Sequence, residues 1–174
     1  MRNSAVEILD THQVMAISTL RPDGWPQTTI VGYVNEGLTV YFLVFRSSQK
    51  LANIRRDMRI SVAVGGEPSE LDQLTAVYAA AHAMEVKDQA ERDRAWKLMQ
   101  QRHGNLAAFD LPEQSDAAMI RADLRHVSVL DYRKGPGHIE DLSIDEDGTP
   151  RSDARKEPWG SSALKPGMIP RSDA

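Results

Sequence analysis

The stretch DGWPQTTIVGYVNEGLTVYFLVFRSSQKLANIRRD, residues 23–57, decides the fold because it alternates turn signals with runs that favour strands. Asp-Gly at its start and Asn-Glu-Gly at 35–37 favour tight turns, since glycine adopts positive φ without strain. The β-branched and aromatic runs at 27–34 and 38–45 predict two consecutive strands. Both faces of the second strand are apolar, which is typical of a central strand in a closed or covered sheet.

A short helix is predicted directly after the second strand, with Ser48 as its N-terminal cap and Arg56 at its end. A helix N-terminus has free N–H groups and carries about half a positive charge. Arg46, Ser48 and Lys50 place guanidinium, hydroxyl and ammonium groups next to it. These groups together favour a phosphate-binding site. The same pattern is also compatible with a capped surface helix whose basic side chains are solvated.

The rest of the chain predicts four more strands and two more helices. Strands are expected at 13–20, 59–64, 74–86 and 123–132, and helices at 3–11 and 88–103. Six strands with short turns and few peripheral helices predict a mainly β protein, an antiparallel barrel over residues 1–142. Residues 143–174 contain four of the nine prolines and show no apolar periodicity. They therefore predict an extended or partly disordered C-terminal tail.

Composition excludes several classes of function. The net charge is −4 over 174 residues, which argues against general nucleic-acid binding. The chain contains no cysteine, so disulfides, iron–sulfur clusters, thiolate zinc sites and a cysteine nucleophile are excluded. The histidines lack the spacing of metal ligands, and no metal site is predicted. Apolar runs are shorter than the ~20 residues that span a bilayer, and the N-terminal stretch is too acidic for a signal peptide. We therefore expect a cytoplasmic protein with no membrane partner.

Several short motifs follow one another in a specific order. A DG-x-P turn precedes a strand, a Ser-x-Lys loop follows the next strand, and the helix after it contains an asparagine and leads to an R-x-S strand. The residues are Asp23, Gly24, Pro26, Ser48, Lys50, Asn53, Arg59 and Ser61. In this order the chain resembles, over about residues 5–140, the FMN-binding split barrels related to pyridoxamine 5′-phosphate oxidase. The resemblance implies a six-stranded antiparallel split β-barrel and a homodimer with a flavin at each subunit interface.

The resemblance also implies which residues bind FMN. Ser48 and Lys50, with Arg46 or Gln49, would hold the phosphate. Strand residues would follow the edge of the isoalloxazine ring, Val44 would lie beside the ring or the ribityl chain, and one aromatic residue would lie beside the flavin. The strand residues are Thr28, Thr29, Ile30 and Val31, and the aromatic residue is Tyr132. No catalytic side chain is assigned, because the redox chemistry belongs to the flavin.

A second basic stretch, RKGPGH at 133–138, follows the last predicted strand. Its glycines allow close approach of the backbone, and its basic side chains could contact an anionic ligand. A surface loop that ends the strand is the alternative interpretation. Because the resemblance places this region near the flavin, we include His138 among the expected cofactor-binding residues.

Two differences from the oxidase bear on the activity. The oxidase has basic residues on its second strand, whereas TTIVGYV at 28–34 has none. Its Arg-x-His-Asp substrate motif is also not reproduced at 131–141. We therefore expect an FMN-dependent oxidoreductase that uses another small-molecule substrate or a nicotinamide donor, and not pyridoxamine phosphate. The alternatives are a barrel that binds a deazaflavin, one that binds haem through His138 or His82, and a non-enzymatic, stress-related FMN-binding protein.

Overall fold

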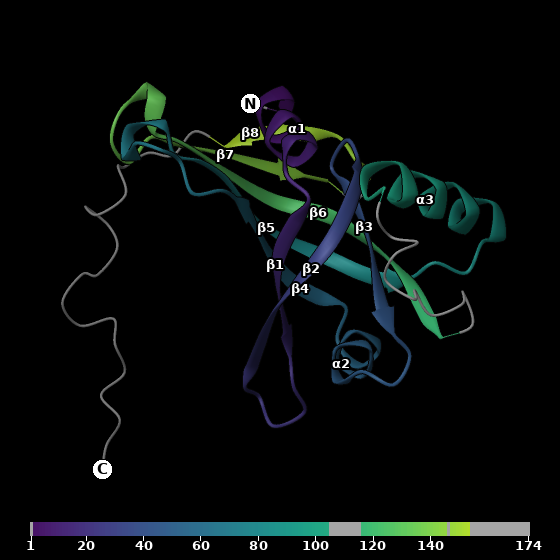
Figure 1. The fold of residues 1–174 in the computed structure, drawn as a ribbon. Coiled ribbons are helices and arrows are strands. Elements are labelled where there is room, and N and C mark those ends of the chain that lie inside the picture. Colours follow the sequence, from purple (N-terminus) through teal and green to yellow (C-terminus); the bar gives the residue numbers. More distant parts are fainter. Residues whose placement is uncertain (1, 105–115, 146, 154–174) are drawn as a thin grey trace, which may run out of the picture.

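The computed structural model describes residues 2–104, 116–145 and 147–153 (Figure 1). In chain order the elements are α1 (Arg2–Thr11), β1 (Val14–Leu20), β2 (Pro26–Glu36), β3 (Thr39–Phe45), α2 (Gln49–Arg56), β4 (Arg59–Gly65), η1 (Leu71–Gln73), β5 (Thr75–Glu85), α3 (Gln89–Arg102), β6 (Ala117–Asp131), η3 (Tyr132–Lys134), β7 (Ile139–Ile144) and β8 (Pro150–Asp153). None of the described helices is long and apolar enough to cross a membrane.

The strands form one antiparallel sheet that closes on itself. Their order is β3-β2-β1-β4-β5-β6-β7-β8, and β3 pairs with β6 in addition. This last pairing joins seven residues of each strand, from Thr39↔Asp123 to Phe45↔Ala117. It closes β1–β6 into a barrel, which confirms the predicted mainly β fold with six antiparallel strands.

Alternating side chains fill the barrel. In β1 and β4 every second residue is buried, as expected for strands with one face toward a core. Ile17, Phe42 and Ile120 are fully buried in this core. Burial of each such side chain contributes roughly 1.5–3 kcal/mol to folding.

Two helices close the barrel and one lies against its outside. Figure 1 shows α1 and α2 at opposite ends, and Leu9 of α1 and Leu51 of α2 both belong to the barrel core. α3 instead packs outside β2, β3 and β6, where Ala95 and Met99 join a second cluster of buried residues around Tyr41. All three helices were predicted from their caps and apolar periodicity.

The C-terminal part of the sheet differs from the sequence prediction. β6 begins at Ala117, six residues before the predicted strand, because residues 117–122 pair with β3 and with the end of β5. The tail predicted from residue 143 begins with a hairpin, in which Ile144 pairs with Pro150 across a turn that contains Gly148 at φ +82°. Residues 154–174 lie outside the described part of the chain.

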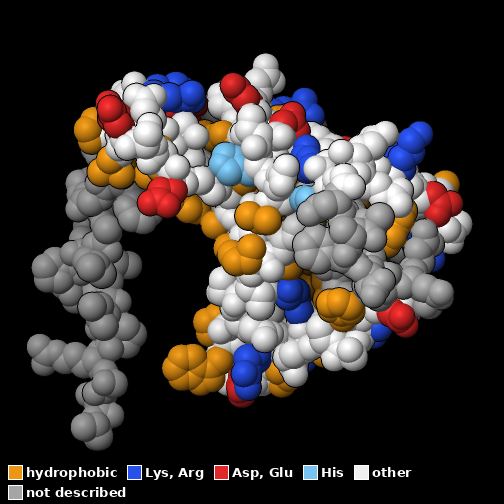
Figure 2. All heavy atoms as spheres, viewed as in Figure 1, with side chains coloured by type: hydrophobic (Ala, Val, Ile, Leu, Met, Phe, Trp, Pro, Cys, Tyr) orange, Lys and Arg blue, Asp and Glu red, His pale blue; other side chains and the backbone are white. Residues whose placement is uncertain are grey.

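The outer surface of the barrel has a face without charged side chains. Residues paired across antiparallel strands point to the same side of a sheet, so the pairings of β1, β2, β4 and β5 place Ala16, Ser18, Thr28, Ile30, Ser61, Ala63, Tyr78 and Ala80 on one surface. We call these residues the uncharged sheet face. Ile30 is 66% exposed and Tyr78 45% exposed. Figure 2 shows hydrophobic side chains over β1 and β2, and two hollows of about 450 and 320 Å³ lie on this face.

Candidate functional site

The barrel opens where β2 and β3 diverge. These strands pair only from Tyr33↔Phe42 to Glu36↔Thr39. On the N-terminal side of Tyr33, β2 continues to pair with β1. On the C-terminal side of Phe42, β3 continues to pair with β6. In the described strands, residues 26–32 of β2 have no ladder partners in β3. Backbone N–H and C=O groups on the facing edges are therefore available to a ligand, as at any sheet edge.

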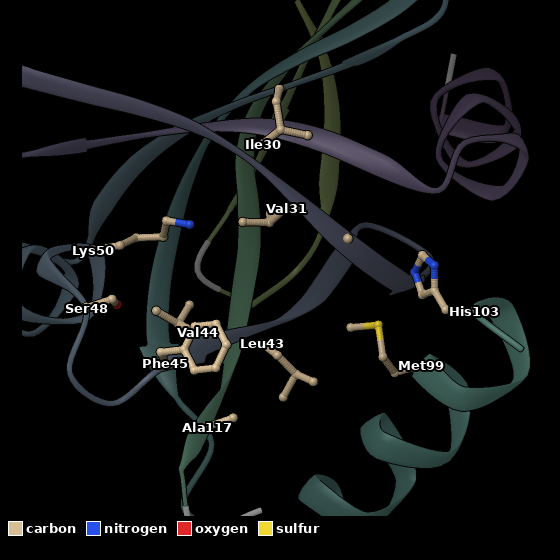
Figure 3. A pocket seen from close by; sticks show the side chains of 11 residues that line it. Ile30, Val31, Leu43, Val44, Phe45, Ser48, Lys50, Met99, His103 and Ala117 are labelled. Atoms are coloured by element: carbon tan, nitrogen blue, oxygen red, sulfur yellow. The ribbon is translucent and has the colours of Figure 1, made fainter. Parts of the chain in front are cut away.

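A pocket of about 340 Å³ lies at this divergence. Its middle is apolar and comes from β2 and β3, while the start of α2 lies at one end and the end of α3 at the other (Figure 3). The lining residues are Ile30, Val31, Gly32, Leu43, Val44, Phe45, Ser48, Lys50, Met99, His103 and Ala117. Sites for small molecules and cofactors usually range from about 300 to 1,000 Å³ and combine apolar walls with few polar groups, as this pocket does.

The α2 end of the pocket is suited to an anion. Ser48 caps the helix, its Oγ accepting a hydrogen bond of 3.2 Å from the Leu51 N–H, and the first turn contains no acidic residue. Lys50 is half-buried, and its ammonium has no hydrogen-bond or ion-pair partner in the described part of the chain. Burial lowers the pKa of Lys50, because the charged form loses hydration that no protein group replaces. A bound anion would supply the missing partner.

Asn53 holds the start of α2 beside the pocket. Its Nδ2 donates to Oγ1 of Thr19 at 3.0 Å and to Oε1 of Gln27 at 3.1 Å, and its Oδ1 accepts from Nε2 of Gln49 at 2.8 Å. Asn53 and Thr19 are both buried. The network connects α2 to β1 and β2, and it fixes the helix N-terminus relative to the strand that lines the pocket.

Arg46 and Gln49, the two alternative phosphate ligands, point elsewhere. Arg46 pairs with Glu85 at 2.7 Å, and Arg55 pairs with the other carboxylate oxygen at 2.8 Å. The hydrogen bonds from Arg55 and then Arg46 lower the pKa of Glu85. Gln49 is bonded to Asn53. Neither residue lines the pocket, so among the described residues Lys50 supplies its cationic side chain.

The predicted β2 residues alternate between the two faces of the strand, with Thr28 and Ile30 on the uncharged sheet face and Thr29 and Val31 on the opposite face. Ile30 and Val31 line the pocket, together with Val44 of β3. The Thr28 hydroxyl lies on the uncharged sheet face, 2.7 Å from that of Ser18. The Thr29 hydroxyl is buried and has no hydrogen-bond partner among the described residues.

Tyr132 and His138 do not line the pocket. Tyr132 begins η3, where its backbone N–H donates to the carbonyl oxygen of Leu74 at 2.9 Å. Nε2 of His138 lies 2.9 Å from Oε1 of Glu140. The structure thus brings together Ile30, Val31, Val44, Ser48 and Lys50 from the predicted set, and places the other predicted residues around the barrel.

Sequence reasoning missed the α3 side of the pocket. Met99 and His103 were not among the expected cofactor-binding residues, yet both line the pocket. One local signal existed: Gly32 interrupts a strand, and a glycine there often marks a close approach. A Cβ on Gly32 would lie 3.5 Å from Cε1 of His103. No group of three or more acidic or histidine side chains in the described residues could hold a metal ion.

The family model described as pyridoxamine 5′-phosphate oxidase matches residues 1–131. No curated protein sequence matches the chain.

Solved structures share the fold at identities too low to show more than the fold. A haem-binding protein from Mycobacterium smegmatis is 20% identical with a TM-score of 0.68, and the match covers 80% of this chain and 57% of that one. An FAD-binding protein from Mesorhizobium loti is 18% identical with a TM-score of 0.61, and the match covers 73% of this chain and 91% of that one. The haem storage protein HutZ from Vibrio cholerae is 14% identical with a TM-score of 0.58, and the match covers 68% of this chain and 86% of that one. Because the family model spans most of its length, the chain belongs to the pyridoxamine 5′-phosphate oxidase family.

Proposed function

We propose that this chain binds FMN in the pocket between β2 and β3 and serves as a flavin-dependent oxidoreductase for a small molecule. One observation carries the proposal. Lys50 places a half-buried ammonium without a partner among the described residues at the N-terminus of α2. A phosphate monoester would pair with that ammonium and with the free N–H groups of the first helical turn.

The rest of the pocket fits the remainder of the cofactor. Val31, Leu43 and Val44 offer an apolar surface to a planar ring, and the unpaired strand edges offer backbone groups to its polar rim. Bound flavin would supply the redox chemistry, accepting a hydride at N5 from a small substrate or a nicotinamide. Reduction of the bound flavin by NADH or NADPH, followed by absorbance, distinguishes an oxidoreductase from a protein that only binds FMN.

We further propose that the protein is a homodimer whose interface is the uncharged sheet face. An isologous interface must bury the same surface of both copies, and this face can be buried without desolvating a charge. Ile30 lines both the pocket and one of the two hollows on the face. A second copy seated there would reach the rim of the pocket and could complete the ligand site.

Replacement of Lys50 by methionine tests the phosphate contact. We expect FMN affinity to fall by about 1–3 kcal/mol, because a charge-assisted contact is lost. Riboflavin, which lacks the phosphate, should bind both proteins equally, and quenching of flavin fluorescence measures both affinities. Lys87→Met is the matched control, because Lys87 is exposed and lies outside the pocket. Equal loss of FMN and riboflavin binding would contradict the assignment.

The same substitution should stabilise the ligand-free protein. The lowered pKa of Lys50 means that the fold disfavours its protonated form, so the charge destabilises the folded state at neutral pH. Lys50→Met should therefore raise the thermal midpoint at pH 7 in flavin-free samples, followed by circular dichroism. The gain should shrink as the pH rises toward the usual lysine pKa of about 10.4, where the charge is lost in both states. A lower midpoint at pH 7 would show that Lys50 is adequately solvated.

Haem is a second candidate ligand, and a specific observation favours it. Met99 and His103 both line the pocket, and thioether and imidazole groups are common axial ligands of haem iron. The histidines expected from sequence are placed differently: His138 faces Glu140, and His82 lies on β5 between Arg59 and Asp123. The absorption spectrum of the purified protein separates the candidates, since bound flavin and haem have different bands.

A further inference from the structure

The pocket has a second polar end that family resemblance did not indicate. Eleven residues line it, and only Ser48, Lys50 and His103 among them have polar side chains. Figure 3 shows Ser48 and Lys50 on one side and His103 with Met99 on the other, with the apolar strand residues between them. Because few polar groups fix the orientation of a ligand in an apolar pocket, the group opposite Lys50 decides which end of a ligand binds there.

The imidazole of His103 is held in one tautomer. Its Nε2 lies 2.9 Å from the backbone carbonyl oxygen of Tyr33. A carbonyl oxygen can only accept a hydrogen bond, so Nε2 carries the proton. In the neutral ring Nδ1 is then the acceptor, and it has no hydrogen-bond partner in the described part of the chain. Nδ1 is therefore an acceptor left free on a residue that lines the pocket.

The end of α3 is anchored strongly enough to keep this ring in place. His103 is the C-terminal cap, and its backbone N–H donates to Met99. The neighbouring Arg102 donates to Asn35 at 2.8 Å and to the carbonyl oxygen of Leu9 at 3.2 Å, and its guanidinium lies 5.6 Å from the centre of the Tyr33 ring. These contacts attach the last turn of α3 to both α1 and β2. Gly32 lies beside the Cε1–Nε2 edge of the imidazole, where an added Cβ would be 3.5 Å from Cε1 and 3.6 Å from Nε2.

We propose that His103 is a specificity-determining residue of the pocket, accepting through Nδ1 a hydrogen bond from a ring N–H of the ligand. The inference rests on the proposed flavin site and deepens it. The pocket would select ligands with a phosphate at one end and an N–H donor on a planar ring at the other. The isoalloxazine ring has one such donor, the imide N3–H, between two carbonyl groups.

Two isosteric variants separate the two nitrogens of the ring. The amide of glutamine reaches the position of Nε2, so His103→Gln keeps a donor to Tyr33 and loses the Nδ1 acceptor. The amide of asparagine lies at the position of Nδ1, so His103→Asn keeps the acceptor and loses the bond to Tyr33. His12→Gln is the control: it makes the same substitution at a histidine that does not line the pocket and that bonds to a backbone carbonyl oxygen through Nδ1, at 2.8 Å.

The experiment measures the affinities of FMN and of FMN methylated at N3, by fluorescence quenching. The wild type and His12→Gln should prefer FMN by about tenfold, the effect of one hydrogen bond to the ligand. His103→Gln should lose this preference and His103→Asn should keep part of it. In all variants the preference for FMN over riboflavin should persist, because Lys50 is intact. A ¹⁵N signal of Nδ1 that shifts on FMN binding is the expected spectroscopic result.

Two results would overturn the proposal. One is a wild-type protein that binds FMN and its N3-methyl analogue equally. The other is a His103→Gln variant that discriminates as well as the wild type. If the wild type binds neither FMN nor riboflavin, the proposed flavin site itself fails, which is a different result from a site that binds flavin without using His103.

Discussion

Substitution of Asn53 by leucine is expected to lower the free energy of unfolding by about 2–4 kcal/mol, because buried groups left without partners typically cost 1–3 kcal/mol each. Leucine has nearly the same size, so the change removes hydrogen bonds with little change in volume. Thr19 loses a hydrogen-bond partner in a buried position. Gln27 and Gln49 each lose a partner in a partly buried position. Chemical denaturation monitored by tryptophan fluorescence measures the effect.

The same variant should also bind FMN more weakly, although Asn53 does not line the pocket. The network positions the N-terminus of α2, and a small displacement of Lys50 weakens a directional contact with phosphate. Asn3→Leu, at an exposed position of α1, is the control and should change neither quantity by more than about 0.5 kcal/mol. Gln49→Leu removes one of the three bonds and should give an intermediate loss. An Asn53→Leu protein as stable as the wild type would show that the network contributes nothing to holding the helix.

The helix α2 could be predicted from the sequence, whereas the hydrogen-bond network of Asn53 that holds it could not. The helix is encoded locally: Ser48 caps it, and Leu51 and Ile54 face the core one turn apart. Gln49, one of the three side-chain partners of Asn53, is in the same helix, but the other two are 26 and 34 residues away in the chain, on two different strands. A motif can mark Asn53 as important, but only the barrel closure decides which groups it meets.

For the same reason, only one end of the pocket could be predicted from the sequence. Ser48 and Lys50 were identified because a strand followed by a capped helix is a local pattern with a known affinity for phosphate. Arg46 belongs to the same pattern, yet Glu85, 39 residues away, takes its guanidinium. His103 enters the site because α3 packs against β2 and β3, and the apolar periodicity of α3 does not show which strands it packs against.

Substitution of Ala80 by arginine is expected to convert the proposed dimer to a monomer. Ala80 is exposed in the single chain and lies on β5, the last of the four strands of the uncharged sheet face, where it pairs with Ser61. A two-fold axis would bury two guanidinium groups at once, and an unpaired buried charge costs about 3–5 kcal/mol. The isolated fold should tolerate the change, because the side chain points to solvent. Sedimentation equilibrium measures the mass, and thermal unfolding at matched concentration checks the fold.

FMN binding by this monomer is the more decisive result. Ala80 does not line the pocket, so a site complete within one chain would keep its affinity. If the second copy completes the site beyond Ile30, Ala80→Arg should weaken FMN binding at least tenfold, and the loss should diminish at protein concentrations that restore the dimer. Ala90→Arg, the same change at an exposed position of α3, should alter neither mass nor affinity. A wild-type protein that sediments as a monomer and binds FMN fully would exclude the dimer, and would require all ligand contacts to come from the residues between β2, α2 and α3.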